Sequence, residues 1–70
     1  MFTSRVKEEM EKAGLSVQAL ADQTGLSTNT IMRARGSMIA RCTLETLATI
    51  SGALNVSTTD LFDEQKGDGK

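Results

Sequence analysis

The sequence predicts an all-α fold, a compact five-helix domain. Three observations predict it: the chain has no proline, its apolar residues recur at steps of three and four, and glycine or a small hydroxyl residue separates each apolar stretch from the next. Seventy residues make a single domain. A chain this short buries only about 60% of the surface that its unfolded form exposes, so we expect marginal stability.

The first predicted helix runs from about Thr3 to Ala13. Its apolar residues fall at steps of four, four and three along one face: Phe2, Val6, Met10 and Ala13. Gly14 supplies the stop, because glycine readily takes the left-handed conformation that ends a helix.

Two shorter helices follow, joined by a three-residue turn. Ser16 has the position of an N-cap for a helix from Val17 to Thr24, and Gly25 ends it. Ser27 caps the next helix, which spans residues 27–35. The residues predicted to face inward are Val17, Leu20, Ala21, Ile31 and Ala34. Helices this short are unstable alone, so they must pack on each other and on a later helix.

Gly36 terminates the third helix, and residues 37–42 read as a loop, although Met38 and Ile39 are apolar. Thr43 caps a fourth helix that ends at Asn55, a residue that tolerates the left-handed conformation. The apolar residues expected on its buried face are Leu44, Leu47, Ala48, Ile50 and Leu54.

A short fifth helix is predicted from Thr58 to Phe62, with Ser57 before it. We therefore place the domain at residues 1–62. Residues 63–70 are polar and contain glycine, and they read as a flexible tail or the start of a linker.

Composition excludes several classes of function. One cysteine and no histidine leave no internal disulfide, no zinc site of the usual ligand count and no common general base. We therefore expect no metal, no cofactor, no small-molecule ligand and no enzymatic activity. No signal peptide or membrane-spanning run of about 20 apolar residues is present, which makes the cytoplasm the expected location.

Charge is unevenly distributed along the chain. The net charge is −1, with eight basic and nine acidic residues. Between Gln23 and Leu44 there are three arginines, Arg33, Arg35 and Arg41, and no acid. That segment is locally basic on an otherwise acidic chain, as a nucleic-acid-binding face would be, although a chance acid-free stretch accounts for it equally well.

The two short helices around Gly25 have the steric features of a helix-turn-helix centred on residues 16–35. Ala21 lets the helices approach closely, Gly25 makes the turn, and Leu26 and Ile31 fill the corner. A generic helical hairpin in a bundle has the same features, so spacing alone leaves both interpretations open.

The chain resembles the phage repressor and Cro type of helix-turn-helix family, the lambda-repressor-like or XRE-like proteins. The resemblance extends from Val6 to Phe62 and rests on LSVQALADQTGLSTNTIMRARG followed by TLETLATISGALNVSTTDLF. Two positions depart from the family pattern. Val17 stands where the family commonly has a phosphate-binding glutamine, with Gln18 next, and Ala34-Arg35-Gly36 closes the third helix one residue early.

The resemblance implies a protein that reads double-stranded DNA through helix 27–35. With Ile31 and Ala34 buried, the side chains expected to point outward and read bases are Thr28, Asn29, Met32 and Arg33. Asn29 has the amide that pairs with adenine and Arg33 the guanidinium that pairs with guanine. The alternatives are a helix-start hydrogen bond for Asn29 and a solvated helix-end charge for Arg33.

The residues expected to contact DNA phosphates are Ser16, Gln18, Ser27, Arg35 and Arg41. Both serines serve equally well as plain caps. Few basic groups imply weak binding by one copy, so we expect a homodimer on a palindromic operator. The candidate dimer contacts are Val56, Phe62, Met38 and Ile39, each of which could instead belong to the core.

Taken together, these features predict a sequence-specific transcriptional regulator, and the resemblance favours a repressor. The alternative with the same fold is an antitoxin or controller subunit whose main partner is another protein. A helical interaction module without any nucleic-acid role is a further alternative, and it predicts that Asn29 and Arg33 are exchangeable without consequence.

Overall fold

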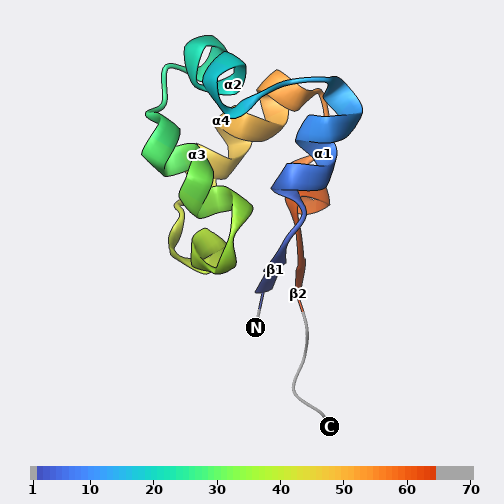
Figure 1. Cartoon of the computed structure of the whole chain (residues 1–70). Helices are drawn as coiled ribbons and strands as arrows, with labels where there is room; N and C mark the ends of the chain where they lie inside the picture. Colours follow the sequence, from blue (N-terminus) through green and yellow to red (C-terminus); the bar gives the residue numbers. More distant parts are fainter. Residues whose placement is uncertain (1, 65–70) are drawn as a thin grey trace, which may run out of the picture.

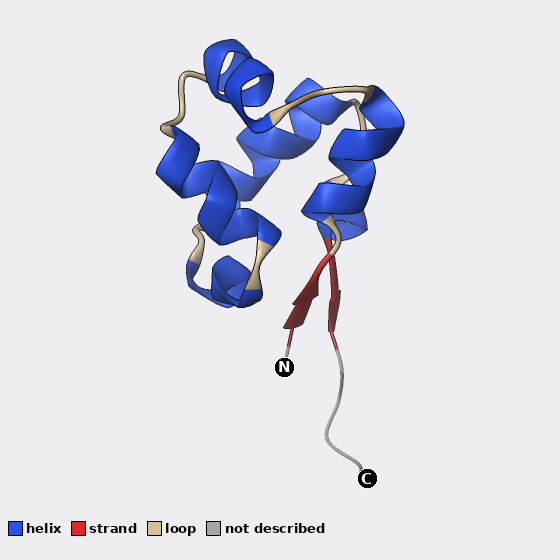
Figure 2. Cartoon of the chain, viewed as in Figure 1, coloured by secondary structure: helices blue, strands red, loops and turns tan. Residues whose placement is uncertain are grey.

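The two ends of the described chain meet in a small antiparallel sheet, and four α-helices lie between its strands (Figures 1 and 2). The structure is a computed structural model that describes residues 2–64. Its elements in chain order are β1 (Phe2–Ser4), α1 (Val6–Ala13), α2 (Val17–Thr24), α3 (Thr28–Arg35), the 3₁₀ helix η1 (Ser37–Arg41), α4 (Leu44–Leu54), the 3₁₀ helix η2 (Thr58–Leu61) and β2 (Phe62–Glu64).

The predicted helix boundaries from α2 to α4 are confirmed by their caps. The hydroxyl of each N-cap residue accepts a backbone N–H three residues on, at 3.1 Å: Ser16 from Ala19, Ser27 from Thr30 and Thr43 from Thr46. Left-handed residues end three of the helices, with φ of 71° at Gly14, 77° at Gly25 and 60° at Asn55. Gly36 ends α3 in an extended conformation instead.

Every α-helix and both 3₁₀ helices contribute to one hydrophobic core. Its buried members are Val6, Met10, Leu20, Ala21, Ile31, Ala34, Ile39, Leu47, Ile50, Leu54 and Leu61. Burying one Leu or Ile side chain stabilises a fold by about 1.5–3 kcal/mol, so these residues supply most of the driving force. None of the helices within residues 2–64 is long and apolar enough to cross a membrane.

The first helix begins later than predicted, because residues 2–4 form a strand. β1 pairs with β2 in the register Phe2 with Glu64 and Ser4 with Phe62. The rings of Phe2 and Phe62 meet edge to face, with centroids 5.5 Å apart. The helical spacing of Phe2 and Val6 was therefore misleading, because the partner that makes Phe2 part of a strand comes from the other end of the chain.

The prediction of a fifth α-helix was wrong, whereas the mostly helical fold of residues 2–64, four α-helices with a small two-stranded sheet, is consistent with the predicted all-α class. Ser57 and Asp60 form a capping box, but only one 3₁₀ turn follows, and Phe62 is extended at φ −156° because it pairs with β1. Asp63 and Glu64, assigned to the tail, belong to β2. The rest of the predicted tail, residues 65–70, lies outside the described residues.

The predicted loop between the third and fourth helices is the 3₁₀ helix η1, and it turns Ile39 into the core. Ile39 is only 2% exposed. On α4 the buried face is narrower than predicted, because Leu44 is 74% exposed and Ala48 also faces solvent. Leu44 is the first residue of α4.

Two glycine substitutions test the role of the left-handed turn. Gly25→Ala should lower the free energy of unfolding by about 1–2 kcal/mol, because its φ of 77° disfavours any Cβ even though the space around it is open. Gly52→Ala, inside α4 and equally open, should raise it by about 0.8–1 kcal/mol. Thermal unfolding followed by circular dichroism should show midpoint shifts of opposite sign. Shifts of equal sign would contradict the assigned backbone conformation.

Candidate nucleic-acid interface

Helices α2 and α3 meet at a tight turn that the sequence stabilises locally. The N–H of Gly25 donates to the carbonyl of Ala21 at 2.9 Å. The hydroxyl of Thr24 donates to the carbonyl of Leu20 at 2.8 Å and accepts the N–H of Leu26 at 3.2 Å. Buried Leu20 and Ala21 of α2 then pack in the same core as Ile31 of α3, which sets α3 across the end of α2.

The four predicted base-reading residues all lie on the exposed side of α3. Ile31 and Ala34 are fully buried, which directs the opposite side of the helix toward solvent. The exposed residues on that side are Thr28, Asn29, Met32 and Arg33, with Met32 54% exposed. Their side chains include an amide, a guanidinium and two groups that can contact a methyl group, which are the types that recognise base edges.

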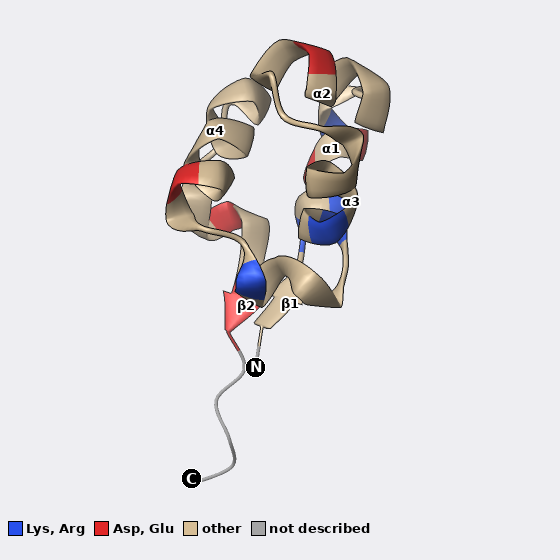
Figure 3. Ribbon diagram, turned by 90° about the vertical axis from the view of Figure 1, so that its left-hand side faces the viewer, with Lys and Arg blue, Asp and Glu red and all other residues tan. Residues whose placement is uncertain are grey.

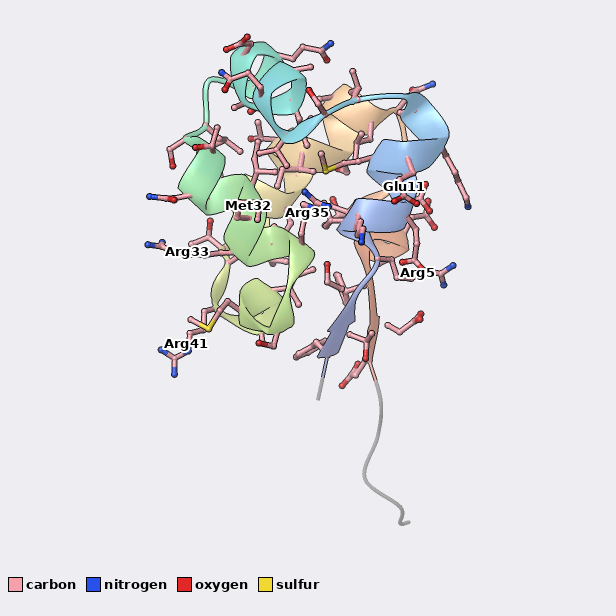
Figure 4. The ribbon with its side chains drawn as sticks, viewed as in Figure 1. Arg5, Glu11, Met32, Arg33, Arg35 and Arg41 are labelled. Atoms are coloured by element: carbon pink, nitrogen blue, oxygen red, sulfur yellow. The ribbon has the colours of Figure 1, made fainter. Side chains whose placement is uncertain are left out.

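An open groove of about 470 Å³ runs between α3 and the start of α4. Its lining residues are Thr30, Arg33, Met38, Arg41, Cys42, Thr43 and Thr46. The lining contains two arginines from different elements and no acidic residue. In Figure 4 the side chains of Arg33 and Arg41 point outward on the same side of the molecule. The groove also begins at the N-cap of α4, where backbone N–H groups favour anions.

The threonines of this groove were missed from the sequence. Thr30, Thr43 and Thr46 line it together with the arginines. Thr43 was assigned only as a cap, although Thr43 and Thr46 stand one helical turn apart at the start of α4, and Thr43 is two residues after Arg41. That clustering of hydroxyl groups behind a basic residue was the signal that could have identified them.

Arg35 does not join the other two arginines. It lies on the other side of α3 and points toward α1 (Figure 4). Its side chain is half-buried, its Nη1 lies 3.7 Å from the sulfur of Met32, and its Nε is buried without a hydrogen-bond partner among the described residues. The physical reason is the helical period, because a residue two positions after Arg33 is rotated by about 200°. Arg35 is therefore poorly placed for the phosphate contact predicted for it.

The remaining predicted phosphate contacts are exposed but already have local partners. The hydroxyls of Ser16 and Ser27 cap α2 and α3 and stay accessible to solvent. The hydroxyl of Ser27 also lies 2.9 Å from that of Thr30. Gln18 is exposed on α2, with its amide nitrogen 3.5 Å from the carboxylate of Asp22.

The four predicted dimer contacts differ in how far they are buried. Ile39 is buried in the core, so it offers no surface to a partner. Val56 and Phe62 are half-buried against the core. Met38 is 41% exposed but lines the groove between α3 and α4.

The charge on α3 differs in sign from that on α2, α4 and β2. Figure 3 faces the side on which α3 lies and shows basic residues on α3 and acidic residues on α2, α4 and β2, while α1 carries both signs. The side of α3 that carries Arg33 thus presents positive charge on a protein whose net charge is −1. A local field of this kind attracts a polyanion to one face of the molecule.

A helix-turn-helix whose second helix presents polar side chains beside a basic groove defines the class of DNA-binding helix-turn-helix domains. The chain belongs to the family of Cro/C1-type HTH DNA-binding domains, whose model matches residues 5–66. The fold is also similar to the crystal structure of a candidate DNA-binding protein from Bacteroides fragilis. That structure is 30% identical in sequence and superimposes with a TM-score of 0.75, over 90% of this chain and all of the other. No curated protein matches the chain.

Proposed function

We propose that the protein is a sequence-specific regulator of transcription that binds double-stranded DNA, and that it represses by occluding a promoter. The observation that carries this proposal is one continuous surface. The exposed side of α3 adjoins an acid-free groove that holds Arg33 and Arg41. An α-helix fits the major groove of B-DNA, and its flanking groups then meet the phosphates. The regulator acts where its operator lies, in the cytoplasm.

In this proposal, the exposed side of α3 contacts the base edges. The amide of Asn29 pairs with the edge of adenine, and the guanidinium of Arg33 pairs with O6 and N7 of guanine. Thr28 and Met32 contact thymine methyl groups. Each good bidentate pair discriminates against the wrong base by about 1–3 kcal/mol, so Asn29 and Arg33 account for most of the specificity.

The groove between α3 and α4 binds most of the phosphates. There Arg41, the hydroxyls of Thr43 and Thr46 and the N-terminus of α4 surround one open volume. Ser16 and Ser27 add contacts at the N-termini of α2 and α3, and Gln18 adds one beside them. Because Arg35 points away, the number of cations on the interface is small, so binding by one copy is weak and falls steeply with salt.

Weak binding by one copy favours a homodimer. Two copies related by a two-fold axis place their α3 helices in successive major grooves, about 34 Å apart, on a palindromic operator. The second copy doubles the number of phosphate contacts without any new basic residue in the chain.

Selection of bound sequences from a random duplex library tests the proposal. We expect enrichment of a palindromic motif at about 50 mM salt, with weaker recovery near physiological salt. Guanine and adenine should dominate the conserved positions of each half-site. Failure to enrich any sequence at either salt would contradict the proposal and would favour a protein partner as the main target.

A further inference from the structure

One hydroxyl group joins the start of α1 to the end of α3. The hydroxyl of Ser4, the last residue of β1, donates to the carbonyl of Ala34 and accepts the N–H of Val6 at 3.2 Å. Val6 is the first residue of α1, and Ala34 lies in the last turn of α3, 30 residues after Ser4 in the chain. At these positions a helix leaves a backbone donor and a backbone acceptor without a partner inside the helix. Ser4 therefore satisfies both groups at once.

Neither of these helix ends is closed by residues of its own helix in the usual way. Within residues 2–64, Arg5, the N-cap of α1, makes no side-chain hydrogen bond to the helix. Gly36 ends α3 in an extended conformation, at φ −121°. At the end of α1, by contrast, left-handed Gly14 lets the N–H of Leu15 donate to the carbonyl of Met10 at 3.0 Å. The last turn of α3 is therefore held by a side chain from another element.

The small sheet fixes the position of Ser4. Ser4 is opposite Phe62 in the antiparallel register, so its backbone is held by the strand that comes from the other end of the described chain. The next residue, Arg5, donates its N–H to the carbonyl of buried Leu61 at 2.7 Å. β1 also packs on η1, the element that follows α3. The pairing of β1 with β2 thus holds the contact that Ser4 makes with α3.

We propose that Ser4 is a positioning residue for base recognition, because it holds the end of α3 at the angle from which Met32 and Arg33 meet the DNA. The inference rests on the proposed function for what α3 reads. Met32 and Arg33 directly precede Ala34 in the same helical turn, so a displacement of the Ala34 carbonyl moves them with it. Arg35, which points toward α1 (Figure 4), has its Nη1 3.7 Å from the sulfur of Met32. Groups that bind a ligand must be held within about 0.5 Å of their productive geometry.

The two ends of α3 are held by different groups. Ser27 caps the first turn, and the turn at Gly25 joins that end to α2. Ser4 holds only the other end. Loss of the Ser4 hydroxyl should therefore lower discrimination at the base pair that Arg33 contacts and leave it unchanged at the base pair that Asn29 contacts. A general loss of stability does not separate the two positions, because it lowers the fraction of folded protein for every DNA sequence alike.

Ser4→Ala is the test, with Ser4→Thr as the conservative variant and Ser51→Ala as the matched control. Threonine keeps the hydroxyl and is favoured in strands. Ser51 is a buried serine whose hydroxyl donates to the carbonyl of Ala48 at 2.9 Å and lies 3.2 Å from the hydroxyl of Thr58. Its replacement also removes a hydrogen-bonded hydroxyl, but one whose partners lie on α4 and η2.

Amide hydrogen exchange of the unbound protein, followed by NMR, gives the first measurement. The N–H of Val6 donates to the Ser4 hydroxyl, and the N–H of Gly36 closes the last turn of α3. Relative to the amide of Leu20 in α2, both should exchange about two- to tenfold faster in Ser4→Ala, the effect of one lost hydrogen bond. Ser4→Thr and Ser51→Ala should leave both ratios as they are in the parent.

Binding to duplexes that vary at one base pair gives the second measurement. The positions that Arg33 and Asn29 contact are identified by Arg33→Ala and Asn29→Ala. Ser4→Ala should lose discrimination about two- to tenfold at the Arg33 position and keep it at the Asn29 position. Ser4→Thr should restore the parent pattern, and Ser51→Ala should keep it.

The two measurements separate this inference from the proposed function. Equal changes at the two base positions in Ser4→Ala, or no change at either, would overturn the positioning role and leave the proposed function standing. Exchange at Val6 and Gly36 that matches the parent would overturn it as well. Absence of any base discrimination by the parent chain would overturn the proposed function and the role in recognition together, whereas faster exchange at Gly36 would still show that Ser4 holds the end of α3.

Discussion

Ile31→Asp should leave the domain without a cooperative unfolding transition. Ile31 is fully buried at the centre of α3, in the core where α2, α3 and α4 meet. An uncompensated buried charge costs about 3–5 kcal/mol, and the lost apolar contacts add about 2–5 kcal/mol. At roughly 0.05–0.15 kcal/mol per residue, the whole stability of a chain this short is about 4–10 kcal/mol. The substitution therefore removes most or all of it.

The adjacent residue is the control for this prediction. Met32→Asp makes a comparable chemical change one position on, where the side chain is 54% exposed. It should retain helicity by circular dichroism and melt within a few degrees of the parent. A cooperative melt of Ile31→Asp at the parent temperature would contradict the burial of Ile31 and so the rotation of α3 about its axis. The assignment of the exposed side of α3 would then also be wrong.

Arg33→Ala should lower discrimination at one guanine position of each half-site by about 5- to 150-fold, the equivalent of 1–3 kcal/mol. Arg33 is exposed and contributes nothing to the core, so the free energy of unfolding should stay within about 0.5 kcal/mol of the parent. Quantitative binding to duplexes that vary at a single base pair measures the effect. An unchanged preference at every position would remove Arg33 from the base-reading set.

The other two arginines make this test specific. Arg41→Ala should weaken binding to all sequences alike and reduce the slope of log affinity against log salt by about one, because its expected contact is a phosphate. Arg35→Ala should change stability more than DNA binding, because its side chain packs beside Met32 and points toward α1. A loss of base preference in Arg41→Ala, or a phosphate-like effect in Arg35→Ala, would contradict the roles that the structure suggests.

The predictions that held depended on local interactions. Ser16, Ser27 and Thr43 each cap a helix through a hydrogen bond to a residue three positions away. Gly25 and Asn55 take left-handed conformations that few other residues tolerate. Since these interactions involve neighbours in the chain, the types and spacing of the residues were sufficient to predict α2, α3 and α4.

The predictions that failed depended on residues far apart in the chain. Phe2 became part of a strand because residues 62–64 pair with it, and that pairing also ended the predicted fifth helix after one turn. Ile39 was expected in a loop. It is buried instead, because the 3₁₀ helix η1 places it in the same core as residues from both ends of the chain, such as Val6 and Leu61. No periodicity within the sequence reports such pairings.

The sequence by itself determined the helix-turn-helix, its turn and the buried and exposed sides of α3, because caps, glycines and the helical period act over a few residues. Only the tertiary structure decided which arginines lie on the same surface. Arg33 and Arg41 meet across a groove that exists because α3 packs beside the start of α4, while Arg35 is turned toward α1. It also decided that Leu44 is exposed beside an apolar hollow, since the walls of that hollow come from both ends of the chain. Such surfaces are formed by packing between elements that are distant in the chain. The sequence therefore does not show which residues share one surface.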